Sequence, residues 1–341
     1  MTTLFTAMDL VKPRHLKEGD TLRIVAPSSS MDVLDMTSVR RGVENLEKLG
    51  LRVEISPYAN RRSGHASGTP RERAKDLMDA FRDPDVDGIM TVWGGWNSND
   101  ILSHLDYAEI RRNAKVFVGY SDITTLNIAL LERAGLISLQ GPAFVTFTHP
   151  HLMHWEVEGF RNTIMFATSP REIVASPAYI DDPYYFLHPE KIPQEVTNPG
   201  WITHRGGVAE GRLVGGHLGT LLALAGTPYW PDLHHKLLLV EEDEEGGPTG
   251  NIARKFRQLE QTGALQEIEA LLIGRFPSVV GLKKDDSLEM ILEDTLERCE
   301  FPVVSDIDFG HTNPIATFPI GVSAKIYADE KRLVYLESAT I

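Results

Sequence analysis

The stretch KVFVGYSDITTLNIALLERAG, residues 115–135, joins an apolar run directly to a helical pattern. Residues 115–120 are typical of a buried strand, and residues 124–134 of an amphipathic helix. Only Ser121 and Asp122 lie between them. A serine at this place is most often a helix cap, but a tight strand-to-helix turn can also present a nucleophile whose following N–H helps to bind an oxyanion. Because the stretch lacks the second glycine of G-x-S-x-G, both interpretations stay open.

Strand and helix patterns alternate on both sides of this stretch. Strand patterns occupy residues 21–30, 51–57, 85–95 and 137–144, and helical patterns occupy residues 36–49, 70–82 and 101–113. Strands separated by helices of this length predict an α/β domain with a parallel sheet. Three polar turns, at residues 28–30, 94–99 and 121–122, then follow strands and meet at the carboxyl edge of the sheet, where ligands bind in such folds.

The second half of the chain begins with a different residue composition. Residues 149–206 are rich in proline, histidine and aromatic residues and are interpreted as a linker plus an irregular loop. From residue 210 strand and helix patterns resume and end in a hairpin. We predict an N-terminal domain of residues 1–170 and a C-terminal domain of residues 171–341, with an aromatic loop at residues 171–206.

Composition and charge limit the class of protein. The 341 residues are 42% hydrophobic and 24% charged, and the formal net charge is −14. An acidic chain without a basic cluster argues against a nucleic-acid partner. The single cysteine, Cys299, cannot form an internal disulfide, and no apolar stretch has the length of a membrane span. These features predict a cytoplasmic protein without a membrane partner.

Candidate partners for a serine nucleophile lie in the second half. Glu241 follows the apolar run 237–240, and His311 lies in DFGHTNP between a strand and a proline turn. A loop histidine at a strand end is a reasonable general base. Strand alternation places Glu241 and Glu242 on opposite faces, so only one of them faces a given site. The alternative is that the acidic run is a solvated turn.

Metal and cofactor sites are disfavoured. His149, His151 and His154 lack further ligands at a suitable spacing and are interpreted as part of an ordinary loop. The glycine pairs 94–95 and 215–216 do not complete a dinucleotide or phosphate-loop motif, although a glycine pair can offer backbone donors to an anion. We therefore expect no metal and no organic cofactor.

Six segments in the same order resemble the LD-carboxypeptidase family of serine peptidases, which includes the microcin C immunity proteins. They are TLRIVAPSS, MTVWGGWNSNDILSHLDY, VGYSDITTLN, EGRLVGGHLGTLLALAGT, LLLVEEDEE and DFGHTNPIATFPIGVSA. The resemblance covers nearly the whole chain. It implies an N-terminal α/β domain, a C-terminal domain with a β-barrel-like sheet and flanking helices, and a homodimer.

The resemblance also implies a Ser-Glu-His triad, which falls on Ser121, Glu241 and His311, with Glu242 as the second choice for the carboxylate. The oxyanion hole of the family uses backbone donors near the glycine pair and after the serine. These positions correspond to Gly95 and Asp122.

Two substrates are compatible with this family. In the interpretation that NPGW and GTPYWPDL favour slightly, the protein resembles the immunity branch and cleaves an amide in an aminoacyl-nucleotide or a related peptide. Gly94 and the rings of Tyr184, Tyr185 and Phe186 would then contact the substrate, although such aromatic residues can also simply pack a loop onto its domain. The alternative is release of the terminal D-alanine of a muropeptide in peptidoglycan recycling. A third interpretation, from another class, is a non-catalytic ligand-binding protein on the same fold.

Overall fold

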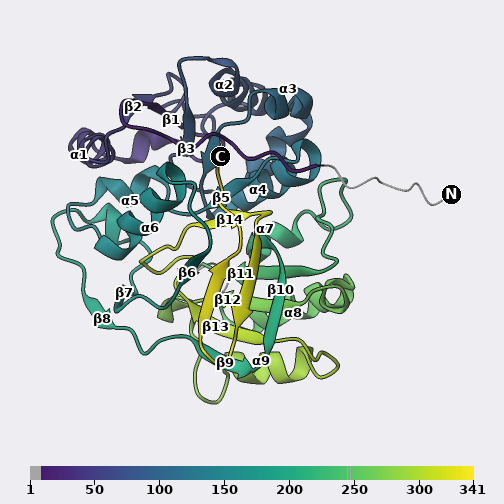
Figure 1. Ribbon diagram of the computed structural model, residues 1–341. Coiled ribbons are helices and arrows are strands. Elements are labelled where there is room, and N and C mark those ends of the chain that lie inside the picture. Colours follow the sequence, from purple (N-terminus) through teal and green to yellow (C-terminus); the bar gives the residue numbers. More distant parts are fainter. Residues whose placement is uncertain (1–8, 244, 246) are drawn as a thin grey trace.

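The computed structural model describes residues 9–243, 245 and 247–341. Residues 1–8 and Glu244, which belongs to the predicted acidic turn, lie outside the described residues. The described residues form two large sheets, one in the upper and one in the lower half of Figure 1, each flanked by helices, and one small two-stranded sheet. The predicted fold class, a parallel-sheet α/β part followed by a second sheet with helices, is confirmed.

The first sheet has the strand order β14-β5-β4-β3-β1-β2. Its strands are β1 (Thr21–Val25), β2 (Arg52–Ile55), β3 (Gly88–Thr91), β4 (Val116–Val118), β5 (Ser138–Gln140) and β14 (Phe318–Ile320). The first five run parallel, and β14 is antiparallel to β5. The order of the parallel strands, 2-1-3-4-5, reverses between β1 and β3, and ligands bind beyond the carboxyl ends of the strands at such a point.

Six α-helices accompany this sheet among the described residues: α1 (Met36–Glu47), α2 (Pro70–Arg82), α3 (Tyr107–Arg112), α4 (Thr124–Ala129), α5 (Phe144–Thr148) and α6 (His154–Met165). The start of α2 is encoded locally, because Thr69 and Glu72 form a capping box around Pro70. The predicted helix over residues 124–134 is α4 continued by a π-helical turn, Leu130–Ala134.

Helix α6 corrects the interpretation of residues 149–206 as linker and loop. Its apolar residues recur at helical spacing and pack into the hydrophobic core around the first sheet. They are Met153, Val157, Phe160 and Ile164. The helix was missed because Met153, at its N-cap, makes no side-chain cap, so the usual start signal is absent.

The second sheet has the order β6-β16-β15-β10-β11-β12-β13-β9. Its strands are β6 (Arg171–Ile173), β9 (Ile202–Arg205), β10 (Val208–His217), β11 (Lys236–Glu241), β12 (Ala270–Gly274), β13 (Val303–Ile307), β15 (Ser323–Tyr327) and β16 (Arg332–Tyr335). Strands β10 to β13 are parallel, and the others pair antiparallel. This is the sheet that the resemblance implies to be barrel-like. Its two edge strands are β6 and β9. Helices α7 (Leu218–Leu222), α8 (Thr249–Gln261) and α9 (Leu288–Thr295) accompany it.

The two halves of the chain are tied together at several points. Strand β14, from the second half, extends the first sheet. The backbone of Ile341 pairs with Pro13 and His15, so the C-terminus returns to the upper half in Figure 1. The domain boundary at residue 170 stays a prediction. No helix in the described part of the chain is long and apolar enough to cross a membrane.

Candidate active site

Ser121 lies three residues after the end of β4, at the start of a 3₁₀ turn, Ser121–Ile123. Its φ angle is 64°, in the left-handed region that side chains other than glycine rarely adopt. Neither the 3₁₀ turn nor α4 uses the Ser121 side chain as a cap. Instead, the hydroxyl lies 3.0 Å from Nε2 of His311. A strained, uncapped serine facing an imidazole is the arrangement of a nucleophile elbow.

The carboxylate at His311 belongs to Glu241, the last residue of β11. Nδ1 of His311 lies 2.7 Å from Oε2 of the fully buried Glu241. Gly310, at φ 104°, makes this approach possible, because a Cβ there would lie 2.6 Å from that carboxylate oxygen. Burial by itself lowers the pKa of His311, but the Glu241 carboxylate outweighs burial and raises the pKa above its ordinary 6.5.

Glu242 points away from His311, as strand alternation requires. Its Oε2 accepts a hydrogen bond from the Lys255 ammonium at 2.7 Å and lies 3.3 Å from Nε2 of His217. His217 ends β10, pairs in register with Glu241, and stacks edge-on against the His311 ring at 5.6 Å between centroids. A second set of charges therefore borders the Glu241–His311 pair.

His217, Glu242 and Asp243 together offer three ligand-type atoms within 4.8 Å of one another. Burial lowers the pKa of His217, but the carboxylates of Asp243 and Glu242 prevail and raise it well above its ordinary value. Protonated His217 and Lys255 therefore balance the negative charges of Asp243 and Glu242. His217 and Lys255 were not predicted from the sequence. The signal for His217 was its position after a glycine pair at the end of a strand.

The glycine pair 94–95 lies between the serine turn and the loop after β1. A Cβ on Gly94 would lie 2.7 Å from Ser121 Oγ and 3.1 Å from the backbone nitrogen of Asp122. Gly95 has φ 147°, and a Cβ there would lie 2.4 Å from Ser28 Oγ. Only glycines fit such close approaches. The backbone of Gly94 therefore lies directly against Ser121, and the backbone of Gly95 lies against Ser28.

Trp96 follows the glycine pair and is 64% exposed. Its Nε1 donates a hydrogen bond of 2.7 Å to Glu245, in the acidic turn after β11. The contact joins the loop after β3 to the loop after β11, on the same side of the two sheets as Ser121 and Glu241. This tryptophan could not be singled out from the sequence, because an isolated aromatic residue in a loop forms no pattern.

The aromatic residues of the predicted loop divide into two groups. Tyr185 and Phe186 are only 4% and 7% exposed, and their rings pack against His149 and Trp93. Tyr184 is 43% exposed. The expectation that all three rings face a substrate is therefore corrected: two of them pack the segment onto the first domain, because burial of apolar ring surface is favourable.

The loop 171–206 nevertheless lies beside the loop that carries His311, called here the histidine loop. It contains the short strands β7 (Ala178–Ile180) and β8 (Glu195–Thr197). The backbone of Ile180 exchanges two hydrogen bonds with Asn313, two residues after His311. His149 and His151 do not gather as metal ligands; His151 pairs with Glu195 on β8 instead.

Comparison with known proteins identifies the family of this chain. The sequence profile of the LD-carboxypeptidase N-terminal domain matches residues 22–141, and that of the LD-carboxypeptidase C-terminal domain matches residues 210–326. The chain is 38% identical over 313 residues to the putative carboxypeptidase YocD of Bacillus subtilis, covering 92% of this chain and 95% of that protein. It is 31% identical to the probable murein peptide carboxypeptidase of the same organism, covering 95% and 93%. It is 29% identical to the microcin C7 self-immunity protein MccF of Escherichia coli, covering 94% of each.

Solved structures give the same result. The MccF-like protein of Bacillus anthracis superimposes with a TM-score of 0.90 at 33% identity, covering 96% of this chain and 99% of the other. MccF in complex with aspartyl sulfamoyl adenosine superimposes with a TM-score of 0.89 at 26% identity, covering 97% and 100%. The two profiles, the full-length relatives and the shared fold lead to one conclusion: the chain belongs to the LD-carboxypeptidase family.

Proposed function

We propose that this protein is a serine amide hydrolase in which Ser121 is the nucleophile, His311 the general base and Glu241 the group that orients His311. The observation that carries the proposal is the continuous chain of contacts from the Glu241 carboxylate through both imidazole nitrogens to the Ser121 hydroxyl, at 2.7 and 3.0 Å. It matches the order of roles in a catalytic triad. Backbone N–H groups of Gly95 and Asp122 are the proposed oxyanion donors.

The reaction follows from these roles. His311 Nε2 takes the proton of Ser121 as the hydroxyl oxygen attacks the amide carbon, and the Glu241 carboxylate stabilises the resulting imidazolium through Nδ1–H. The imidazolium then delivers its proton to the leaving nitrogen, the C–N bond breaks, and an acyl-enzyme remains. Water, deprotonated by His311, releases the acid and restores the serine.

For the substrate we propose an aminoacyl-nucleotide or a related peptide amide. MccF, whose fold the chain shares, has been solved with aspartyl sulfamoyl adenosine. The exposed ring of Tyr184 lies in a segment joined to the histidine loop through Ile180, and it offers a surface on which a base can stack. Gly94 would contact the scissile group from the opposite side. The alternative substrate is a murein peptide ending in D-alanine, supported by the relative that carries that activity in its name.

A hydrolysis assay offering aspartyl sulfamoyl adenosine and a murein tetrapeptide side by side tests both substrates. We expect faster turnover of the nucleotide; faster turnover of the tetrapeptide would assign the recycling role. A fluorophosphonate, which reacts with activated serines, tests the mechanism independently of the substrate. Labelling of the wild type but not of Ser121→Ala supports the triad, whereas an unlabelled, folded wild type supports the non-catalytic binding protein.

We also propose a cytoplasmic homodimer, from the single cysteine and the family resemblance. Light scattering on the purified protein measures the oligomeric state, and cell fractionation measures the location.

A further inference from the structure

We propose that the side chain of Asp122 is a positioning residue that sets the geometry of the oxyanion hole, with Arg73 holding the same loops from the other side. This inference rests on the proposed function, because it concerns where two backbone donors lie relative to Ser121. The residues involved are Ser28, Arg73, Asn97, Ser98 and Asp122, called here the Asp122 network.

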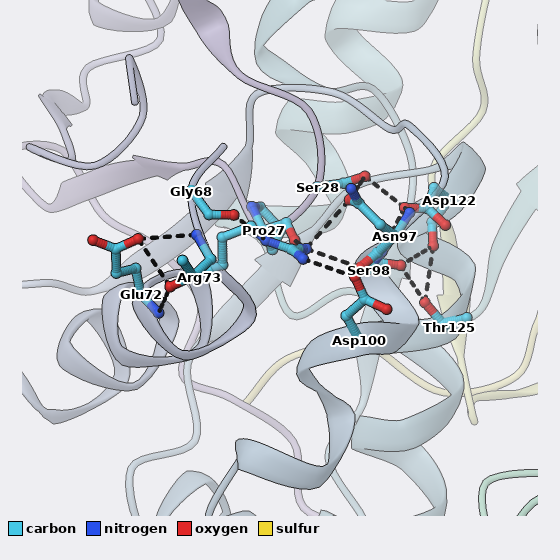
Figure 2. A network of polar contacts seen from close by, with 11 residues as sticks. Pro27, Ser28, Gly68, Glu72, Arg73, Asn97, Ser98, Asp100, Asp122 and Thr125 are labelled. Carbon is cyan, nitrogen blue, oxygen red and sulfur yellow. Dashed lines mark hydrogen bonds and ion pairs between the residues drawn. The ribbon is translucent and has the colours of Figure 1, made fainter. Parts of the chain in front are cut away.

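One carboxylate oxygen of Asp122 accepts three hydrogen bonds. The donors to Oδ2 are Ser28 Oγ at 2.6 Å, the backbone N–H of Asn97 at 2.9 Å and the backbone N–H of Ser98 at 2.8 Å. In return, Ser98 Oγ donates to the backbone carbonyl of Asp122 at 2.6 Å. Asp122 is 5% exposed, so its charge depends on these donors rather than on water. Figure 2 shows the three donors around the carboxylate.

These contacts join the segments that must supply the oxyanion donors. The N–H of Gly95 belongs to the loop after β3, and the N–H of Asp122 belongs to the turn after β4, so the hole exists only if two separate loops keep one spacing. Asn97 and Ser98 lie two and three residues after Gly95. Asp122 therefore supplies one donor with its backbone and fastens the loop of the other donor with its side chain. Ser28 connects the loop after β1 to this network, and the hydroxyl of Ser28 lies against Gly95.

Arg73, on α2, holds the same loops from the opposite side. Its guanidinium donates to the backbone carbonyl of Pro27 at 2.6 Å and to that of Asn97 at 2.8 Å. The side chain is 1% exposed and forms an ion pair with Asp100. Figure 2 shows Arg73 and Asp122 reaching the Asn97–Ser98 segment from two directions. Arg73 therefore holds the loop after β3 by donating to its backbone carbonyl, and Asp122 holds the same loop by accepting from two of its backbone N–H groups.

A positioning role has a kinetic signature that a merely structural role lacks. An oxyanion hole acts on charge that develops in the transition state, so a displaced donor lowers the rate of reaction and leaves ground-state binding nearly unchanged. The pH dependence that His311 sets is unaffected as well, because the base and its carboxylate are untouched. Loss of stability alone would change none of these quantities in the folded fraction.

The test uses Asp122→Asn, which keeps the shape and removes the charge. Its matched control is Asp76→Asn, because Asp76 is also 5% exposed in the same domain and accepts a hydrogen bond from a buried serine, Ser56, but it contacts none of the loops around Ser121. Both variants and the wild type react with increasing concentrations of a fluorophosphonate. In this reaction the Ser121 oxygen forms a bond to phosphorus, fluoride leaves, the hydroxyl proton passes to His311, and the phosphoryl oxygen takes the place of the oxyanion.

For Asp122→Asn we expect the limiting rate of inactivation to fall by about 100-fold, the loss that a donor displaced by about 1 Å can cause. The half-saturating concentration of the probe and the pH profile should stay those of the wild type. For Asp76→Asn we expect an unchanged limiting rate, whatever its melting temperature. Should Asp122→Asn not fold, Ser28→Ala removes one of the three donors, with Ser56→Ala as its control, and a smaller fall in the limiting rate is expected.

A limiting rate in Asp122→Asn equal to that of the wild type or of Asp76→Asn would overturn the inference while leaving the proposed function standing. A shifted pH profile would also overturn it, because the damage would then be at His311. A folded wild type that does not react at Ser121 would overturn the proposed function and this inference together.

Discussion

The turn after β4 and the loop 171–206 border the same site but are built in opposite ways. At the turn, Ser121 is strained, Gly94 packs against it at a distance that excludes any Cβ, Gly95 packs equally closely against Ser28, and Asp122 accepts three hydrogen bonds. The loop 171–206 has only strands of three or four residues and one short 3₁₀ turn, Tyr185–Leu187, and Tyr184 is exposed. The difference suggests that the reacting atoms are held by the tightly packed side and that the substrate is selected on the loosely built side.

The largest effect is expected from the tightly packed side, at Glu241. Glu241→Gln removes the charge that orients His311 and stabilises its imidazolium, so kcat should fall by about 10³- to 10⁴-fold for both substrates. Steady-state kinetics on the folded variant measures this loss. Glu242→Gln is the matched control: it disrupts the buried pair with Lys255 and should lower stability by about 3–5 kcal/mol, with a far smaller loss of kcat. Equal losses of kcat in the two variants would contradict the assignment of Glu241.

A second prediction concerns the close contact at Gly94. Gly94→Ala places a methyl group 2.7 Å from Ser121 Oγ, so the serine or the glycine loop must shift. A displacement of this size should cost about 100-fold in rate. Gly250→Ala is the control, since its Cβ enters open space on α8. It should leave activity unchanged and raise the melting temperature slightly, because alanine favours helix. An active Gly94→Ala would mean that the turn is less rigid than its contacts indicate.

The loosely built side is tested at Tyr184. Tyr184→Ala should weaken binding of aspartyl sulfamoyl adenosine by about tenfold or more, as expected for loss of a stacking ring worth about 1–3 kcal/mol. Cleavage of a murein tetrapeptide should not change. Leu187→Ala, in the same turn and also exposed, controls for loss of side-chain volume without loss of a ring. Equal losses on both substrates would show that the loop contributes structure rather than selection.

The smallest expected effect is a shift in the pH profile. His311 must be neutral to accept the proton of Ser121, and Glu241 raises its pKa above 6.5. The value of kcat/KM should therefore rise with pH and reach half its maximum above 6.5. In Glu241→Gln the carboxylate is gone. Burial and His217 still lower the pKa of His311, and of the main causes only Asp243 still raises it, so the residual activity should reach its half-maximum at lower pH. A midpoint in the wild type below 6.5 would contradict the pairing of His311 with a charged Glu241.

Much of the site could be predicted from local sequence. The apolar run before Ser121 and the helical pattern after it left no room for a loop, so a tight turn was required. Alternation along β11 separated Glu241 from Glu242 for the same local reason. Helix α6 was missed although its apolar spacing was present, because no residue marked its start.

The rest depended on contacts between residues far apart in the chain. Nothing near Tyr185 or Phe186 indicated that their rings would be covered by His149 and Trp93 while Tyr184 stayed exposed. The place of β14 in the first sheet was equally hidden, because any strand pattern can pair with either sheet.

Local sequence was enough to predict the alternation of strands and helices, the turn at Ser121 and the face on which Glu241 lies, because these follow from backbone periodicity over a few residues. It could not predict that Arg73 and Asp122 hold the same loop, or that His217 packs against His311 while Lys255 pairs with Glu242. These contacts were set by tertiary packing, because a buried charge is stable only beside its partners, and the packing of whole sheets brings together partners that are far apart in the chain.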